Sequence, residues 1–266
     1  MLNWLTSYFY PEKESKSLRT YGWRPDDDDS RDKYRDIKAF TTNSYIDLRH
    51  KCPKIYNQGT LGSCTANAIA AAYEFDEYKQ SEKKPFMPSR LFIYYNERKM
   101  EGSVDIDSGA QIRDGIKSIN RIGVVSEEAW PYDEEKFTNQ PPEELYILAK
   151  KHQSVQYQRV KQDITHIKQV LQEGYPIVFG FVVYKSFETP EVAKTGMMVM
   201  PKDNDEQMGG HAVMAVGYDD KQEVVIVRNS WGEEWGDKGY FYMPYEFITN
   251  SDLASDFWTV QRVKDI

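Results

Sequence analysis

The spacing of apolar residues along the chain changes at about residue 174. Before it, segments such as 109–123 repeat apolar residues every three to four positions (here Ile112, Ile116 and Ile119), which is typical of amphipathic helices. After it, short β-branched and aromatic runs are separated by turn residues, which is typical of strands. Because helices and strands are segregated, the sequence predicts an α+β fold with two lobes.

Individual helices and strands follow from the same pattern. An alanine-rich stretch after Gly62 and Ser63 favours a long helix, because alanine has the highest helix propensity. The predicted helices cover 64–80, 89–99, 109–123, 141–152 and 163–174. The predicted strands cover 176–184, 211–218, 223–231, 239–244 and 256–263.

The first residues of the chain differ from the rest. They contain four aromatic residues between positions 4 and 10 and an acidic run at 26–29, but little apolar periodicity. Such a segment is too short for a core of its own, so we divide the chain into an N-terminal extension (1–45) and a globular domain (46–266). We interpret 26–29 as a solvated acidic linker, since its spacing does not match a calcium-binding loop.

The composition disfavours several classes of function. The 266 residues carry 42 acidic and 34 basic side chains, and the net charge of −8 disfavours binding to nucleic acid. No run of eighteen apolar residues could span a membrane, and the N-terminus lacks the features of a secretory signal. We therefore expect a cytoplasmic protein or, if it is viral, one of the host cytoplasm or the virion. Phosphate-binding and zinc motifs are missing, so we expect neither metal nor cofactor.

Two cysteines and four histidines limit the choice of catalytic groups. Cys52 precedes a proline in an irregular segment, and we interpret it as a small buried hydrophobe. Cys64 follows a glycine-rich turn at the start of a predicted helix, where unpaired N–H groups and the helix dipole stabilise a thiolate. The pKa of a thiol so placed can fall far below its ordinary value of about 8.5, so Cys64 is the candidate nucleophile.

His211 is the candidate base. It follows Gly209 and Gly210 at the start of a predicted strand, which would fix the orientation of its ring. The other three histidines lie in charged or helical segments and are expected at the surface or the edge of the core. Asn229 ends another strand, and its amide oxygen could accept a hydrogen bond from one imidazole nitrogen. Each of these residues taken alone also fits a purely structural role.

Three motifs occur in order along the chain. They are QGTLGSC with Gln58 and Cys64, GGHAVMAVGY with His211, and RNSWGEEWGDKGYF with Asn229 and Trp231. Together they resemble the papain-like, cathepsin-type cysteine peptidases. The separation from Cys64 is 147 residues for His211 and 165 for Asn229. The family spacing is about 130–150, so the histidine fits and the asparagine lies slightly beyond it.

The resemblance implies a papain-like fold, with a helical lobe, a β-barrel-like lobe and the active-site cleft between them. It also implies hydrolysis of peptide bonds by a Cys64 thiolate paired with a His211 imidazolium. Asn229 would orient the imidazole, and Trp231 would shield that hydrogen bond from water. The Gln58 amide and the Cys64 backbone N–H would donate to the developing oxyanion.

The same resemblance assigns substrate contacts. Gly109 corresponds to a cleft glycine that faces the substrate backbone, and Gly210 and Ala212 flank the main side-chain pocket. We expect the floor of that pocket within 253–256 and room in it for an apolar or aromatic side chain. The expected activity is that of an endopeptidase, acting as a monomer on peptides or proteins.

Two positions depart from the usual family pattern. In this the chain resembles the family members from bacteria, archaea and large viruses that have no signal peptide. Leu61 stands where the family has a cysteine that closes a disulfide, which fits a reducing compartment. Thr65 replaces an aromatic residue below the cleft. No long helical prodomain is visible, so the N-terminal extension could either occupy the cleft as an inhibitor or wrap around the outside.

Three other functions remain open at this point. The chain could be an inactive homologue that binds peptides, although an altered set of catalytic residues would then be expected. It could transfer the acyl group to an amine and so ligate peptides with the same residues. It could also be a structural α+β protein in which the motifs occur by chance.

Overall fold

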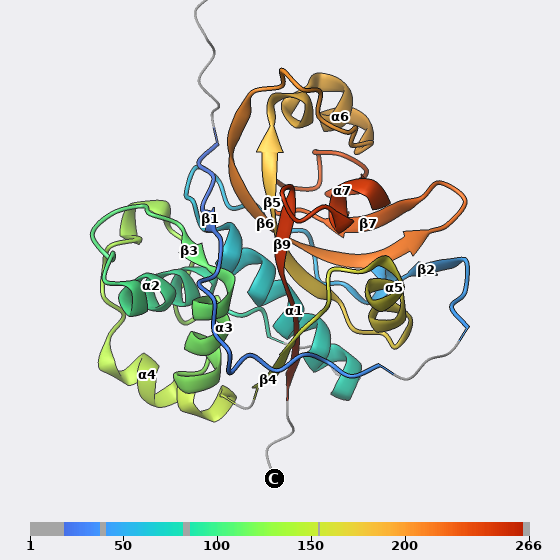
Figure 1. Cartoon of the computed structure of the whole chain (residues 1–266). Coiled ribbons are helices and arrows are strands. Elements are labelled where there is room, and N and C mark those ends of the chain that lie inside the picture. The colour runs from blue at the N-terminus through green and yellow to red at the C-terminus, as the bar shows by residue number, and fades with distance from the viewer. Residues whose placement is uncertain (1–18, 38–40, 82–85, 154, 263–266) are drawn as a thin grey trace, which may run out of the picture.

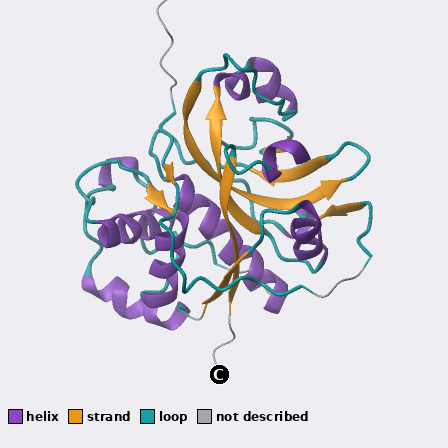
Figure 2. Ribbon diagram, in the orientation of Figure 1, coloured by secondary structure: helices purple, strands orange, loops and turns teal. Residues whose placement is uncertain are grey.

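The computed structural model describes residues 19–37, 41–81, 86–153 and 155–262. The helices between residues 90 and 149 gather on one side of the molecule, and the antiparallel sheet with the helices between residues 164 and 249 lies on the other (Figure 1, Figure 2). Helix α1 (Cys64–Ser81) lies beside both. The predicted α+β architecture with two lobes is confirmed. Within the described parts of the chain, no helix is long and apolar enough to cross a membrane.

Among the remaining elements, those that the sequence predicted lie within a few residues of their predicted ranges. The helices are α2 (Arg90–Glu101), α3 (Ile112–Arg121), α4 (Glu143–Ala149), α5 (Ile164–Gln172), α6 (Pro190–Thr195) and α7 (Tyr245–Thr249), with short 3-10 turns η1 (Arg49–Lys51), η2 (Glu134–Lys136), η3 (Lys150–His152) and η4 (Lys185–Glu188). The strands are β1 (Trp23–Arg24), β2 (Tyr45–Asp47), β3 (Ala110–Gln111), β4 (Val155–Arg159), β5 (Ile177–Tyr184), β6 (Gln207–Asp219), β7 (Val224–Arg228), β8 (Tyr240–Pro244) and β9 (Ala254–Arg262). The hydrophobic pattern missed α6, α7 and β1 to β4, each of which has six residues or fewer.

Helix α1 packs against both lobes because its side chains are small. Ala66, Ala70 and Ala72 are fully buried, and Ile69 and Tyr73 pack beside them. These residues share one apolar cluster with residues of β6 and β9. Short side chains let the helix backbone approach the sheet closely, so the N-terminus of α1 is held at the junction between the lobes.

The sheet has seven strands in the order β4-β9-β5-β6-β7-β8, and β2 pairs with β6. Its neighbouring strands are antiparallel, and the β5–β6 register places Phe181 opposite His211 and Gly180 opposite Ala212. Strand β6 begins at Gln207, so His211 lies inside the strand and not at its start as the pattern predicted. The hydrogen bonds with β5, which pairs with β6 from Gln207 to Ala215, therefore fix the backbone that carries this histidine.

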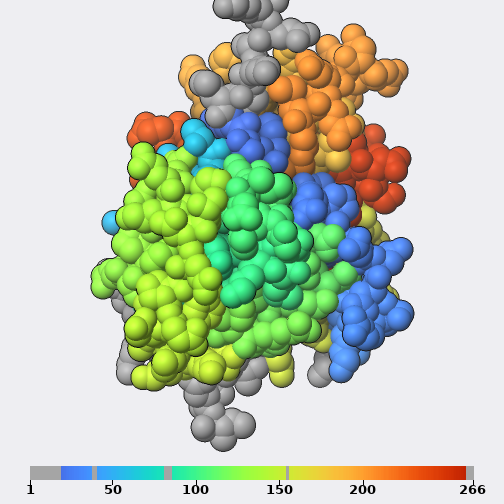
Figure 3. Space-filling model, turned by 90° about the vertical axis from the view of Figure 1, so that its left-hand side faces the viewer, coloured from blue at the N-terminus to red at the C-terminus, as the bar shows by residue number. Residues whose placement is uncertain are grey.

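The described N-terminal residues 19–37, which we call the strap, lie along the junction between the lobes. Figure 1 shows β1 beside β3 on the helical side and close to the strands β5 and β6. Strand β1 pairs in parallel with β3, with Trp23 opposite Ala110. Figure 3 shows the blue strap residues at the surface next to the green helical lobe.

The interpretation of 26–29 as a solvated linker is wrong. The side chain of Asp26 is 0% exposed and accepts hydrogen bonds from Trp258 Nε1 (2.8 Å) and Arg159 Nη2 (3.2 Å). Asp29 pairs with Arg31 of the strap itself. The acidic run contains a buried anchor because basic and indole groups that lie far away in the sequence fold onto it.

A prediction tests the core of the strand lobe. Phe241 is fully buried, and its ring lies 5.0 Å from that of Phe187 and 5.8 Å from that of Phe181. We expect Phe241→Ala to lower the free energy of unfolding by about 3–5 kcal/mol, because it removes apolar contacts and leaves a cavity. Urea unfolding measures this. The matched control is Ile147→Ala, at a side chain that is 59% exposed, with an expected change below about 0.5 kcal/mol.

Candidate active site

Cys64 is the first residue of α1 and is completely buried. Its thiol faces backbone groups of Ala212 in β6, of Gly22 in the strap and of Thr65 in its own helix. Burial raises the pKa of the Cys64 thiol to about 12, although the backbone groups of Ala212 and Gly22 oppose this rise. The sulfur therefore lies where the N-terminus of α1 meets β6, in its protonated form while the strap is in place.

His211 lies next to Ala212 and is also completely buried. Its Nε2 donates a hydrogen bond to Asn229 Oδ1 over 2.8 Å, and its Nδ1 has no hydrogen-bond partner among the described residues. The Trp231 ring stacks on the imidazole, with the centroids 4.8 Å apart and the planes at 26°. Burial lowers the pKa of His211 to about 4, so the ring is neutral at pH 7.

Gln58 is held by the segment that also carries Asn229. Ser230 Oγ donates to Gln58 Oε1 over 2.6 Å, and Gln58 N donates to Ser230 O over 2.9 Å. Gln58 Nε2 donates one proton to Leu61 O over 2.9 Å. These bonds fix which way the amide points, and the second proton on Nε2 stays available.

A buried carboxyl group supports α1 directly after Cys64. Thr65 Oγ1 donates to Glu97 Oε1 over 2.6 Å, and both residues are completely buried. Burial raises the pKa of Glu97 to about 8, so this carboxyl group is largely protonated at pH 7. Thr65, which stands where the family pattern has an aromatic residue, thus links the helix that carries Cys64 to α2.

The strap occupies the surface where Gly109 and Gly210 were expected to face a substrate. Ala110 N donates to Gly22 O over 2.7 Å. A Cβ atom added to Gly109 would lie 1.9 Å from Gly22 O, and one added to Gly210 would lie 2.4 Å from Trp23 O. Both glycines therefore allow the backbone of the strap to approach closely. Ala212 is buried beside Cys64 instead.

Comparisons with known proteins agree with this arrangement. The model of the papain family of cysteine proteases matches residues 42–259. The chain belongs to the papain family of cysteine proteases. It is 55% identical to an uncharacterized peptidase C1-like protein of Acanthamoeba polyphaga mimivirus over 79% of this chain and 70% of the other. It is 29% identical to Peptidase 1 of Dermatophagoides farinae over 77% of this chain, but it spans only 62% of that protein.

Solved structures of papain-family enzymes superpose on the fold. Xylellain, a cysteine protease from Xylella fastidiosa, matches with a TM-score of 0.87 and 41% identity over 95% of this chain and 99% of the other. Procathepsin L 3 of Tenebrio molitor larval midgut matches with a TM-score of 0.65 and 17% identity over 88% of this chain and 76% of the other. The second likeness concerns the fold alone.

The Trp23 side chain fills a pocket beside Gly180 and Gly210. A Cβ atom on Gly180 would lie 1.9 Å from the indole, so the pocket exists because this papain-family chain has no side chain there. Trp23 Nε1 donates to Asp256 Oδ2 over 3.2 Å. A cavity of about 400 Å³ continues beside Trp23 and is lined by Leu253, Ala254 and other residues. Residues of the stretch 253–256, which we expected to form the floor of a substrate pocket, thus lie beside Trp23.

An ionic network holds the strap behind Trp23. Arg159 reaches Asp26 (3.2 Å), Asp32 (2.9 Å) and Asp256 (3.2 Å), and Arg113 pairs with Asp32 (2.6 Å). Three carboxylates thus share two guanidinium groups. Burial and the nearby Asp256 charge raise the pKa of Asp26 to about 6.

Sequence reasoning missed the residues that close the site. Tyr21, Gly22 and Trp23 lie against it, and Asp256 holds Trp23, but none of them was a candidate. The only signal was an aromatic residue just before the acidic run. Among the other histidines, His166 is buried, not at the surface, and its Nδ1 accepts from Lys161 N.

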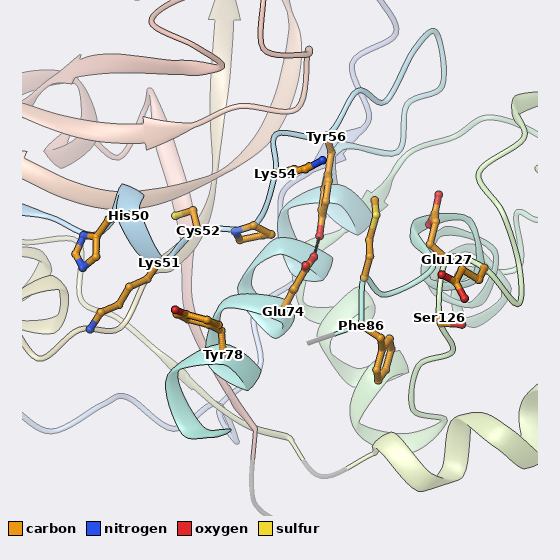
Figure 4. Close-up of a pocket in the computed structure, with 13 residues that line it drawn as sticks. His50, Lys51, Cys52, Lys54, Tyr56, Glu74, Tyr78, Phe86, Ser126 and Glu127 are labelled. Carbon is orange, nitrogen blue, oxygen red and sulfur yellow. Dashed lines mark hydrogen bonds between the residues drawn. The ribbon is translucent and has the colours of Figure 1, made fainter. Parts of the chain in front are cut away.

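A second hollow lies away from the catalytic candidates. This cavity of about 610 Å³ is lined by Cys52, Tyr56, Glu74, Tyr78 and other residues, and none of the predicted site residues lines it (Figure 4). Tyr56 and Glu74 hydrogen bond to each other inside it. Within the described residues, no group of three histidine, cysteine or acidic side chains could hold a metal ion.

The burial of Cys64 leads to a prediction about its reactivity. At pH 8 the full-length chain should react with iodoacetamide at Cys64 at least about 100-fold more slowly than a free cysteine peptide, because the thiolate is disfavoured and covered. Mass spectrometry of the alkylated peptide measures the rate in a Cys52→Ser background. Labelling of Cys64 at the rate of the free peptide would contradict the buried site.

Proposed function

We propose that the chain hydrolyses peptide bonds through a Cys64 thiolate and a His211 imidazolium. The observation that carries the proposal is the pairing of His211 Nε2 with Asn229, while the neighbouring Ala212 backbone faces the Cys64 sulfur. Since Asn229 engages one imidazole nitrogen, Nδ1 is the nitrogen left to exchange a proton with the thiol. Trp231 covers the histidine–asparagine bond and keeps water from competing for it.

The proposed reaction has two stages. The Cys64 thiolate attacks the scissile carbonyl carbon, the C–N bond breaks, and the His211 imidazolium gives its proton to the leaving amine. Neutral His211 then removes a proton from water, which attacks the thioester and regenerates the thiolate and the imidazolium. The second N–H of Gln58 Nε2 and the Cys64 backbone N–H donate hydrogen bonds to the oxyanion and stabilise it in both stages.

The strap runs through the proposed cleft in the direction opposite to a substrate. The amine that His211 protonates belongs to the residue after the scissile carbonyl, so the C-terminal part of a substrate must lie toward His211 and Trp231. In the strap, it is the N-terminal residues that lie toward His211 and Trp231. The Arg19 guanidinium is 4.2 Å from the Trp231 ring centroid, and the ring centroids of Tyr21 and His211 are 6.1 Å apart. The chain then leaves past Arg24 and Glu101. A reversed peptide does not present a carbonyl to Cys64 with its amine on the side of His211.

The N-terminal extension, residues 1–45, therefore acts as an inhibitor attached to the peptidase domain of residues 46–266 in this proposal. It covers the nucleophile and also keeps the catalytic pair neutral. With the strap in place, the pKa of Cys64 is raised and that of His211 is lowered, both by burial. Removing the strap admits water, which favours the thiolate–imidazolium pair.

The length of the covered surface favours an endopeptidase. The strap contacts the protein on both sides of Cys64, from Trp231 at one end to Glu101 at the other. A groove that holds several residues on each side of the nucleophile accepts the interior of a polypeptide. The indole in the pocket at Gly180 shows the size of side chain that fits there, so we infer a preference for a large apolar or aromatic residue. We further propose that the enzyme acts as a monomer.

The first test combines two substitutions. Trp23→Ala should raise the hydrolysis of a fluorogenic peptide by the full-length chain at least about 10-fold, because it removes the side chain that anchors the strap beside Asp256. Adding Cys64→Ala should abolish this activity, while Cys52→Ser should not. Unchanged hydrolysis in the Cys64→Ala protein would refute the assignment of the nucleophile. Peptide products joined to an added acceptor amine would identify ligation instead of hydrolysis.

The second test concerns pH. In the closed state the pKa of Asp26 is raised from 3.8 to about 6, so the closed strap binds a proton more tightly than the open one. This contribution to closure is complete below about pH 4 and is lost as the pH rises through about 6. The ratio of full-length to Trp23→Ala activity should therefore increase by one to two orders of magnitude between pH 4 and pH 7.

Asp26→Leu provides the control for this pH dependence. The variant lacks the titrating carboxyl group, so the ratio of its activity to that of Trp23→Ala should be nearly independent of pH over the same range. A ratio for the unmodified full-length chain that falls as the pH rises would contradict the proposed latch.

A further inference from the structure

The peptide unit between Leu61 and Gly62, just before the nucleophile, is held at both ends. Its carbonyl accepts from Gln58 Nε2 over 2.9 Å, and its N–H donates to the Asp107 carboxylate. We propose that Asp107 is a positioning residue for the peptidase reaction, which aligns the oxyanion donor Gln58 through this peptide unit. The inference rests on the proposed function, because it assigns a role within the same site.

Asp107 is well placed to set the plane of that peptide. Both of its carboxylate oxygens lie 3.0 Å from Gly62 N, so the N–H points at the middle of the carboxylate group. Hydrogen bonds that involve an ionised acceptor are the stronger ones in proteins. Turning the peptide unit would lose this bond and, at the other end, would move the Leu61 carbonyl away from Gln58.

Asp107 is itself fixed from helix α2. The Tyr94 hydroxyl donates to Asp107 Oδ1 and accepts from Gly109 N over 3.2 Å. Burial, followed by the hydrogen bond to Asp107, raises the pKa of Tyr94, so its hydroxyl remains a donor. The same tyrosine therefore links the turn before Cys64 to the cleft glycine that faces the strap.

One turn further along α2, Arg98 holds the loop that carries Asp107. This arginine is completely buried and donates to Val104 O over 2.7 Å and to Ile106 O over 3.0 Å. Its guanidinium group also lies 4.1 Å from the centroid of the Tyr94 ring. A buried, fully engaged guanidinium makes this loop a rigid support and not a mobile surface segment.

No covalent bond reinforces this junction. The only two cysteines of the chain, Cys52 and Cys64, are both free, and Leu61 occupies the position where a disulfide would start in the family pattern. The turn at 61–63 is thus joined to the loop around Asp107 through the Gly62 N–H bond. In this proposal, Ser230 holds the Oε1 end of the Gln58 amide, and the Nε2 end depends on a hydrogen bond at Gly62 that a single substitution removes.

Two reactions of Cys64 separate a positioning role from a merely structural one. Hydrolysis of an amide needs the oxyanion donors, and loss of one such donor lowers kcat by about 10²–10³. Alkylation by iodoacetamide needs the thiolate but forms no oxyanion. A variant that misaligns Gln58 should therefore lose hydrolysis and keep alkylation, whereas a damaged fold loses both.

The experiment uses the full-length chain with Trp23→Ala as the parent. Asp107→Leu removes the acceptor of Gly62 N–H and should lower kcat 10- to 100-fold, with KM and the alkylation rate of Cys64 within threefold of the parent. Asp107→Asn keeps one acceptor oxygen and should stay within about fivefold in kcat. The matched control is Asp105→Leu in the same loop, at an exposed side chain, which should leave both rates unchanged.

Two results would overturn the inference. One is an Asp107→Leu enzyme whose kcat stays within twofold of the parent. The other is a parallel fall in hydrolysis, alkylation and thermal midpoint, which would make Asp107 a structural residue only. A parent protein that is alkylated at Cys64 but hydrolyses no peptide would instead contradict the proposed function, and the positioning role would fall with it.

Discussion

The close packing of the N-terminus of α1 against β6 is the contact on which the site depends. It brings the Cys64 sulfur to the backbone of Ala212, and therefore next to the residue that carries the imidazole. Small side chains on α1 permit this approach, and the hydrogen bonds between β5 and β6 keep the histidine backbone in place. A larger side chain on the buried face of α1 would separate the two lobes and with them Cys64 and His211.

Burial has two opposite consequences in this protein. It supplies the apolar environment in which a few well-directed hydrogen bonds position Gln58, His211 and Asn229. It also raises the pKa of Cys64 and lowers that of His211, so both groups are neutral. The strap adds the last part of that burial, so the same segment completes the packing of the junction and, in the proposed function, suppresses the chemistry.

The sequence predicted the long elements and the catalytic candidates because both leave local signals. Alanine content revealed α1, and residues before and after Cys64, His211 and Asn229 formed recognisable motifs. The strap was not predictable in this way. Trp23 is buried by Gly180 and Asp256, and Asp26 by Arg159 and Trp258, which are all far from it in sequence. An acidic run has the same composition whether water or arginine surrounds it.

The space that receives Trp23 exists because Gly180 has no side chain. A single methyl group there would collide with the indole, while the fold of β5 around it would remain that of an ordinary strand. In the proposed function, a latent enzyme and a permanently active one therefore differ by as little as one carbon atom. In the proposed function, a single substitution at Gly180 would therefore release the inhibition by the strap and leave the catalytic residues unchanged.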